Sequence, residues 1–243
     1  MSDSLAKYST YELKCRNAHD KNFLANTSEE FRRLYLEARD VTMLSRERLF
    51  DFYSSVNHVI RHEIPGDIVE VGCWGGGALA IALSVVQANR SDKSVWGFDT
   101  FEGHPEPSPD ELDVWGNSQL ERFNELKEQG ADWCKVSLDE VHQNVAAICR
   151  STDGLRLVKG KAEETLPIHF PKKVSIIRCD VDWYEPSVAT FQVLYPRLSP
   201  GGIVIVDDYG HHSGSKKAVD EYFGEIHPKF THIDYSCITF VKP

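Results

Sequence analysis

Short apolar runs alternate along the chain with longer segments in which apolar residues recur every three to four positions. The short runs are typical of strands covered on both faces, and the longer segments are typical of helices that bury one face. Strands are therefore expected over 67–72, 94–99, 155–159, 174–178 and 203–206, with two more within 230–241. Helices are expected over 27–40, 45–64, 78–88, 117–129, 138–149, 186–198 and 215–223.

Strands that alternate with helices predict an α/β fold with a doubly wound, mostly parallel sheet. Residues 64–243 are expected to form one structural unit, and residues 1–63 an N-terminal helical extension that could act as a lid or an oligomer contact. Residues 1–26 are polar and predicted to be irregular. The segment 103–118 is rich in proline, glycine and acids and is predicted to be a loop, and Pro200–Gly202 to be a turn.

The composition and net charge of the chain exclude several classes of function. The chain has 243 residues, of which 41% are hydrophobic, and its 27 basic and 37 acidic residues give a net charge of −10. Such an acidic chain is unsuited to nucleic acid or an anionic membrane, because phosphate binding needs a basic surface. The apolar stretch 78–86 is too short to span a bilayer, and the N-terminus lacks the apolar core of a secretory signal. Six cysteines without a C-x-x-C pair are expected to be free thiols in a reducing cytoplasm.

The first predicted strand runs into a glycine-rich turn, and ligands in such sheets bind where the strands end. Trp74 stands where a dinucleotide-binding fingerprint needs glycine, and no phosphate-binding Gly-Lys-Ser/Thr sequence follows. Glu70 at the strand end would repel a phosphate and attract a cation, while Asp99 could accept hydrogen bonds from ribose hydroxyls. These residues favour a cationic adenosyl ligand such as S-adenosylmethionine over the alternative, a plain tight turn with solvated acids.

Four aspartates end two other predicted strands. Asp180 and Asp182 follow one strand, and Asp207 and Asp208 follow the next. If the strands are neighbours, carboxylates about 4 Å apart would repel by about 4 kcal/mol at an effective dielectric constant near 20. A cation or shared protons would relieve that repulsion, and oxygen ligands favour Mg²⁺, Ca²⁺ or Mn²⁺. The alternative is an acidic rim neutralised by Arg178, Lys216 and Lys217.

An ordered series of motifs covers most of the chain, from Thr42 to about Phe223. The motifs are Thr42–Ser45, Pro65–Asp67, Glu70–Gly77, Asp99–Gly103, Gly160, Thr165–Pro167, Asp180–Glu185, Leu198–Gly202 and Asp207–Gly210. This series resembles the macrocin O-methyltransferase family, whose members methylate hydroxyls of sugars or aromatic rings in natural-product pathways. The resemblance implies a class I, Rossmann-like methyltransferase fold, S-adenosylmethionine, Mg²⁺, a small-molecule hydroxyl acceptor and a homo-oligomer.

The resemblance also implies residue roles. The metal ligands would be Asp180, Asp207 and Asp208, which are similar to the strand-end acids of catechol O-methyltransferase. Asp182 would be the general base or would help to position it. The cofactor would be held by Met43, Glu70, Gly72, Gly76, Asp99, Thr100, Lys161 and Ala162.

The chemistry of methyl transfer fits these residues independently. Alcohols are poor nucleophiles, and a divalent cation (Mg²⁺, or Mn²⁺ in its place) would orient the hydroxyl and lower its pKa while a carboxylate takes the proton. His104 and His142 in the predicted lid are rival bases, as are His211 and His212 after the paired aspartates. Two other functions stay open: a metal-dependent glycosyltransferase that uses Asp180-Val181-Asp182, and a non-catalytic binding module, which has no need of costly clustered charge.

Overall fold

The computed structural model describes residues 20–243. A seven-stranded sheet with the order β3-β2-β1-β4-β5-β7-β6 forms its centre. The parallel strands are β1 (Asp67–Val71), β2 (Val95–Asp99), β3 (Leu155–Lys159), β4 (Val174–Cys179) and β5 (Leu198–Val206). The strand β7 (Ile238–Val241) runs antiparallel to both β5 and β6 (Thr231–His232). The predicted mostly parallel sheet is confirmed.

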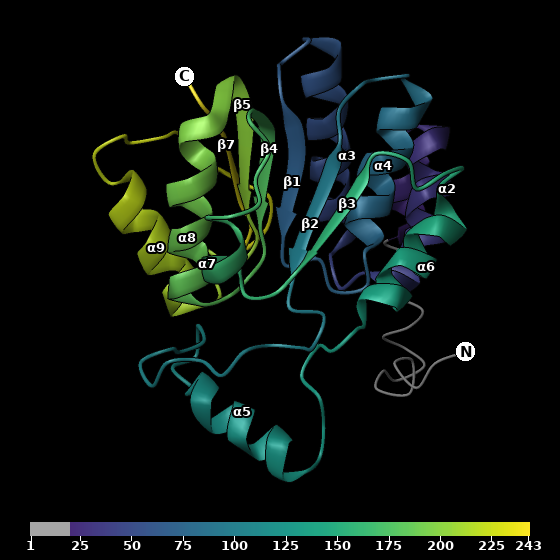
Figure 1. Cartoon of the computed structure of the whole chain (residues 1–243). Helices are drawn as coiled ribbons and strands as arrows, with labels where there is room; N and C mark the ends of the chain where they lie inside the picture. Colours follow the sequence, from purple (N-terminus) through teal and green to yellow (C-terminus); the bar gives the residue numbers. More distant parts are fainter. Residues whose placement is uncertain (1–19) are drawn as a thin grey trace.

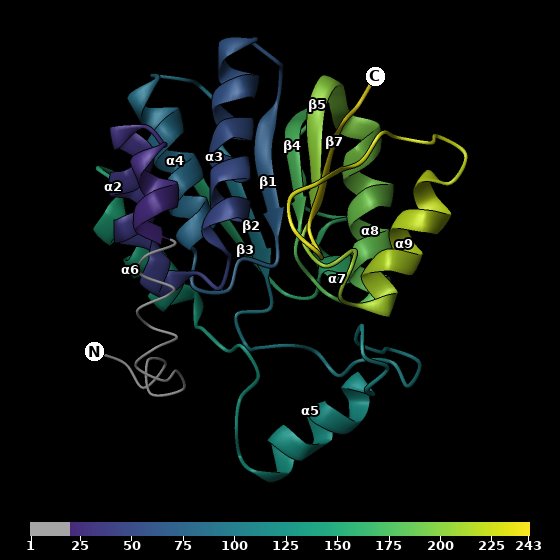
Figure 2. The ribbon, with the colours of Figure 1, turned by 180° about the vertical axis from the view of Figure 1, so that it is seen from behind.

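Helices cover both faces of this sheet (Figures 1 and 2). One face carries α2 (Glu29–Ala38), α3 (Arg46–Arg61), α4 (Gly77–Ala88) and α6 (Leu138–Ile148). The other face carries α7 (Ala162–Thr165), α8 (Tyr184–Leu194) and α9 (Ser213–Phe223). Within residues 20–243, no helix combines the length and the apolar character that a membrane crossing would need.

The N-terminal helices begin at serine caps and share the core of the sheet. Ser28 Oγ accepts a hydrogen bond from Phe31 N, and Ser45 Oγ accepts one from Arg48 N, which satisfies backbone donors that a helix start leaves free. The apolar faces of both helices lie in one buried cluster with α4; that cluster includes Phe31, Leu34, Leu49, Phe52, Leu79 and Ile81. Most of α4 is buried, and its sequence is accordingly apolar except at Ser84 and Gln87, which are half-buried.

The strand order places a binding crevice between β1 and β4. The chain runs outward from β1 through β2 to β3 and then returns to β4, so the direction of winding reverses beside β1. In open α/β sheets, ligands bind at the carboxyl ends of the strands at this reversal. The β1–β4 register sets Glu70 opposite Arg178, which brings two charged side chains to the same level of the sheet.

The segment between β2 and α6 extends beyond the carboxyl ends of the strands, at the bottom of Figure 1. It contains α5 (Gln119–Glu128), while residues 103–118 are irregular, as predicted. Leu112 and Ser213 exchange two hydrogen bonds of 2.8 and 2.9 Å, so the irregular part is fastened to the start of α9. The segment therefore forms a cover over the edge of the sheet where ligands are expected.

Three local predictions were wrong. The turn predicted at Pro200–Gly202 lies inside β5, whose pairing with β4 shifts register, so that the extra residues form an irregularity with Gly201 at φ +78°. The helix predicted to reach Leu198 ends at Leu194, and a 3₁₀ turn over Tyr195–Arg197 leads directly into the strand. Residues 20–25 are helical although 1–26 were predicted to be irregular, and residues 1–19 lie outside the described part.

The cysteines from residue 20 onward are free thiols, as predicted. Cys73, Cys149, Cys179 and Cys237 are buried, and Cys134 is half-buried. Cys15 lies outside the described residues. The thiols that the structure describes thus act as small apolar side chains.

Two glycines with a left-handed backbone allow the cost of backbone strain to be compared with the cost of overpacking, because only one of them packs against another helix. Gly76 has φ +83°, and a Cβ there would lie 2.9 Å from Val141 Cγ1 of α6. Gly116 has φ +84°, and no atom lies within 4 Å of its added Cβ. We expect Gly116→Ala to cost about 1–2 kcal/mol of unfolding free energy from strain alone. Gly76→Ala should cost about 1–3 kcal/mol more, from overpacking against α6. Urea unfolding measures both, and equal losses would show that the α4–α6 contact does not require a glycine.

Candidate active site

A pocket opens at the carboxyl ends of β1, β2 and β4, next to the β1–β4 crevice. It is lined by predicted site residues from five segments of the chain: Met43, Gly72, Asp99, Thr100, His104, Lys161, Ala162, Asp180 and Asp182. The predicted residues Glu70, Gly76, His142, Asp207 and Asp208 do not line it. Met43 comes from the irregular residues before α3 and is 63% exposed, whereas the other lining residues come from the strand ends, the cover and the turn before α7.

Asp99 fixes the glycine turn after β1. Its Oδ2 accepts hydrogen bonds from Cys73 N at 2.8 Å and Trp74 N at 3.1 Å, and its Oδ1 accepts one from Phe101 N at 2.9 Å. Gly72 has φ +82°, and a Cβ there would lie 1.8 Å from the carbonyl oxygen of Asp180. Only glycine fits this close approach of two strand ends, so backbone forms this wall of the pocket.

Arg178 lies beneath the pocket and binds three carboxylates. Its side chain is 1% exposed, and Nη1 is 2.7 Å from both Glu70 Oε1 and Asp180 Oδ2. Its Nη2 is 2.5 Å from Asp207 Oδ1. A buried guanidinium needs such partners, because an unpaired charge in the interior is costly. Arg48 on α3 adds a second cation, pairing with Asp207 and, at 2.6 Å, with Asp234.

This pairing changes the interpretation of Glu70. Its carboxylate was expected to attract a cationic ligand, but the structure buries it against Arg178, below the pocket wall. Burial raises the pKa of Glu70 to about 8, against the attraction of Arg178. The predicted alternative of an acidic rim is confirmed for Arg178 only, since Lys216 pairs with Asp220 and Lys217 lies over the ring of Tyr184.

Asp182 stands at the meeting point of the acid cluster and two histidines. It has φ +62°, an uncommon conformation for a residue with a side chain, and its carbonyl accepts a hydrogen bond from Ser215 N. His104 Nε2 lies 3.3 Å and His212 Nε2 lies 3.7 Å from Asp182 Oδ2. Burial raises the pKa of Asp182 to about 7 and lowers that of His212 to about 3. A carboxylate with a raised pKa is a stronger proton acceptor at neutral pH.

The aspartates form two groups that could hold a metal ion, and Asp208 belongs to both. Oxygen atoms of Asp180, Asp207 and Asp208 lie within 4.8 Å of one another, as do ligand atoms of Asp182, Asp208 and His212. One buried carboxylate oxygen of Asp208 has no hydrogen-bond partner. Burial, together with Asp182 and Asp207, raises the pKa of Asp208 well above its usual range. The clustered carboxylates outnumber the two arginines, so the donor set fits a divalent cation.

Three further residues lie outside the pocket lining: Gly76 and His142, which were predicted to belong to the site, and Glu111, which was not. Gly76 packs against α6 rather than facing the pocket, and His142 is exposed on α6. Glu111, which the sequence did not single out, is 2% exposed and accepts hydrogen bonds from Tyr184 N at 2.7 Å and Gly214 N at 3.0 Å. It therefore fastens the cover to the first turns of α8 and α9, where a negative charge is favourable.

A family model described as macrocin O-methyltransferase (TylF) matches residues 8–242. The chain belongs to this family. Demethyldecarbamoylnovobiocin O-methyltransferase of Streptomyces niveus is 34% identical over 211 residues, which are 84% of this chain and 78% of the relative. The 8-demethyl-8-(2,3-dimethoxy-alpha-L-rhamnosyl)-tetracenomycin-C 4'-O-methyltransferase of Streptomyces olivaceus is 34% identical over 184 residues, 75% of this chain and 67% of the relative.

The solved structure of the O-methyltransferase NovP matches with a TM-score of 0.73 at 32% identity, covering 83% of this chain and 82% of that one. Membership and fold make this macrocin O-methyltransferase family member an enzyme with the class I fold of S-adenosylmethionine-dependent methyltransferases. The glycosyltransferase and the non-catalytic binding module are thereby set aside.

Arg178 offers a direct test of the buried ion cluster. Arg178→Met would leave Glu70, Asp180 and Asp207 without their shared cation, and breaking such a buried pair costs about 3–5 kcal/mol. The control is Arg33→Met, because Arg33 pairs with Glu37 on an exposed helix surface and should cost less than about 1 kcal/mol. Urea unfolding of both variants gives the free energies. Similar losses for the two variants would mean that the cluster does not depend on Arg178.

Proposed function

We propose that this enzyme transfers a methyl group from S-adenosylmethionine to a hydroxyl of a sugar or aromatic small molecule in natural-product biosynthesis, with a divalent cation, Mg²⁺ or Mn²⁺, at the strand-end acids. The observation that carries the proposal is the adjacency of two features in one pocket: the glycine turn at Gly72 and the acid pair Asp180 and Asp182. The Streptomyces olivaceus relative at 34% identity is named for a rhamnosyl-bearing compound and a 4'-O-methyl transfer, which supports a sugar acceptor.

The cofactor would lie along the carboxyl ends of β1 and β2. Bound there, S-adenosylmethionine supplies a methyl group on a positively charged sulfur. Gly72 lines this part of the pocket, Asp99 retains lone pairs for ribose hydroxyls beside Thr100, and Lys161 and Ala162 border the same pocket. Glu70 acts indirectly in this proposal, because its contact with Arg178 sets the position of Asp180.

The acid cluster would serve the acceptor. A Mg²⁺ ion held by Asp180, Asp207 and Asp208 would supply charge that lowers the pKa of the acceptor hydroxyl and fixes its orientation. Asp182 lines the pocket and would accept the proton of that hydroxyl on a carboxylate oxygen. His104 Nε2, 3.3 Å from Asp182 Oδ2, would hold this carboxylate in place or act as the base itself.

Asp99→Ala tests the cofactor site. It removes the carboxylate that would accept hydrogen bonds from the ribose, and each bond to a charged group contributes about 1.5–3 kcal/mol. We expect the Kd for S-adenosylmethionine, measured by isothermal titration calorimetry, to rise at least about tenfold. Glu102→Ala, on the same loop but exposed, is the control and should leave the Kd unchanged. Unchanged binding in Asp99→Ala would remove Asp99 from the cofactor site.

Asp182→Asn tests the general base. The amide cannot take a proton, so kcat should fall about 10²–10⁴-fold while the Kd for S-adenosylmethionine stays within a few-fold of wild type. The loss should shrink for acceptors with acidic hydroxyls, which ionise with less help. His104→Gln is the matched variant on the other side of the 3.3 Å contact. If Asp182→Asn keeps kcat and His104→Gln loses it, the base is His104.

A further inference from the structure

His212 is a buried imidazole with no hydrogen-bond partner. It precedes α9 as the residue at its N-cap, and its side chain is only 9% exposed. Trp183 and His211 pack against its ring, with ring centres 5.3 and 4.6 Å away. Its Nδ1 is buried without a partner, and its Nε2 faces Asp182 Oδ2 at 3.7 Å. An imidazole buried in this way is costly unless its nitrogens are used.

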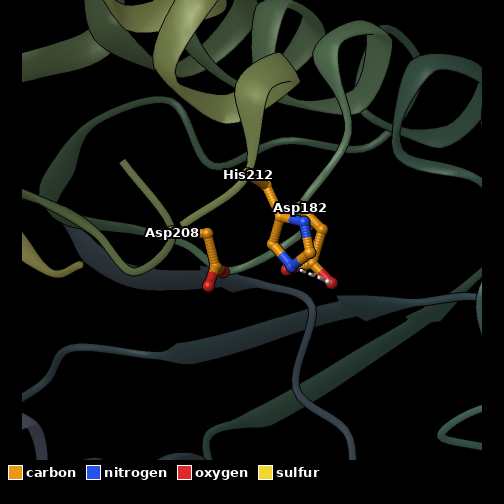
Figure 3. Close-up of side chains that lie close together, drawn as sticks. All are labelled: Asp182, Asp208 and His212. Atoms are coloured by element: carbon orange, nitrogen blue, oxygen red, sulfur yellow. Dashed lines mark ion pairs between the residues drawn. The ribbon is translucent and has the colours of Figure 1, made fainter. Parts of the chain in front are cut away.

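Asp208 lies next to His212 and Asp182 (Figure 3). One of its oxygens is buried and has no partner, and one ligand atom from each of Asp182, Asp208 and His212 lies within 4.8 Å of the others. In an octahedral site with bonds of about 2.1 Å, ligand atoms lie about 3.0 Å apart when adjacent and about 4.2 Å apart when opposite. The observed 3.7 Å between His212 Nε2 and Asp182 Oδ2 lies between these two separations, so a small shift of either side chain would bring both atoms onto one ion.

Asp182 and Asp208 differ from the other aspartates of the cluster in that no arginine in the described part of the chain forms an ion pair with them. Arg178 binds Asp180 and Asp207, and Arg48 also binds Asp207. Among residues 20–243, the ion pairs of Asp182 involve only His104 and His212, and Asp208 forms none. A cation on Asp208 would therefore meet carboxylate oxygens that no described arginine binds on the side of Asp182 and His212.

From this arrangement, we propose that His212 is a nitrogen ligand of the divalent cation bound at Asp208, with Asp182 as a further ligand. The inference rests on the proposed metal dependence and deepens it, because it changes the preferred ion. A site with an imidazole nitrogen favours Mn²⁺, and more strongly Co²⁺ and Ni²⁺, over Mg²⁺, which prefers oxygen alone. Asp182 has two oxygens, so one can bind the ion while the other accepts the proton of the acceptor.

Mn²⁺ is the probe that detects this ligand directly. The full chain is freed of metal with a chelator and loaded with Mn²⁺, and electron spin echo measurements record whether a nitrogen-14 nucleus is coupled to the ion. We expect nitrogen coupling in the wild type and its loss in His212→Ala, together with a rise of about tenfold or more in the Kd for Mn²⁺. The Kd for Mg²⁺ should rise by a smaller factor.

Three variants complete the comparison. His211→Ala removes the neighbouring imidazole and should keep the nitrogen coupling, and His104→Ala removes the other histidine next to Asp182 and should keep it too. His212→Asn removes the imidazole but introduces a residue that is favoured at a helix N-cap. This variant is used if His212→Ala does not fold.

The outcomes separate the two proposals. Mn²⁺ that binds without nitrogen coupling in the wild type overturns the role of His212 and leaves the metal dependence intact. Coupling that persists in both His212 variants and disappears in His104→Ala assigns the ligand to His104 and also overturns it. If no protein binds Mn²⁺ or Mg²⁺ at all, the metal dependence of the proposed function fails as well.

Discussion

The buried guanidinium of Arg178 joins three neighbouring strands through their acids. It contacts Glu70 on β1, Asp180 at the end of its own strand β4, and Asp207 at the end of β5. These contacts hold several carboxylates close together where the parallel strands end. Without the guanidinium, burying so many carboxylates would be very costly. Asp182 and Asp208 form no ion pair with an arginine among the described residues, so the same cluster that stabilises the sheet leaves two carboxyl groups for chemistry.

Features set by local sequence could be predicted. The serine caps at Ser28 and Ser45 mark the helix starts, the alternation of apolar runs and helical segments gives the α/β sheet, and Gly72 marks the turn that ends β1. Each of these depends on a few neighbouring residues. The pocket accordingly contains most of the residues that the strand ends and the family resemblance had indicated, including Asp99, Asp180 and Asp182.

Features that depend on tertiary packing could not be predicted from the sequence. Strand alternation does not say that Glu70 faces Arg178 across the β1–β4 register, or that Gly76 is needed by α6 rather than by a ligand. The role of Glu111 depends on where an irregular segment docks, about seventy residues before Tyr184 and a hundred before Gly214 in the chain. His212 shows the same limit, because its burial and its direction toward Asp182 follow from how α9 begins.

A crystal structure of the enzyme with S-adenosylhomocysteine and Mn²⁺, with data collected at the manganese absorption edge, tests most directly whether these unpaired carboxylates hold a cation beside the methyl donor. The cofactor product should lie against the turn at Gly72 with its ribose at Asp99. An anomalous peak should lie within bonding distance of a carboxylate oxygen of Asp208. S-adenosylhomocysteine bound at Gly72 with no anomalous peak at Asp208, at saturating Mn²⁺, would contradict a metal-assisted transfer. S-adenosylhomocysteine bound away from Gly72 and Asp99 would contradict the cofactor site itself.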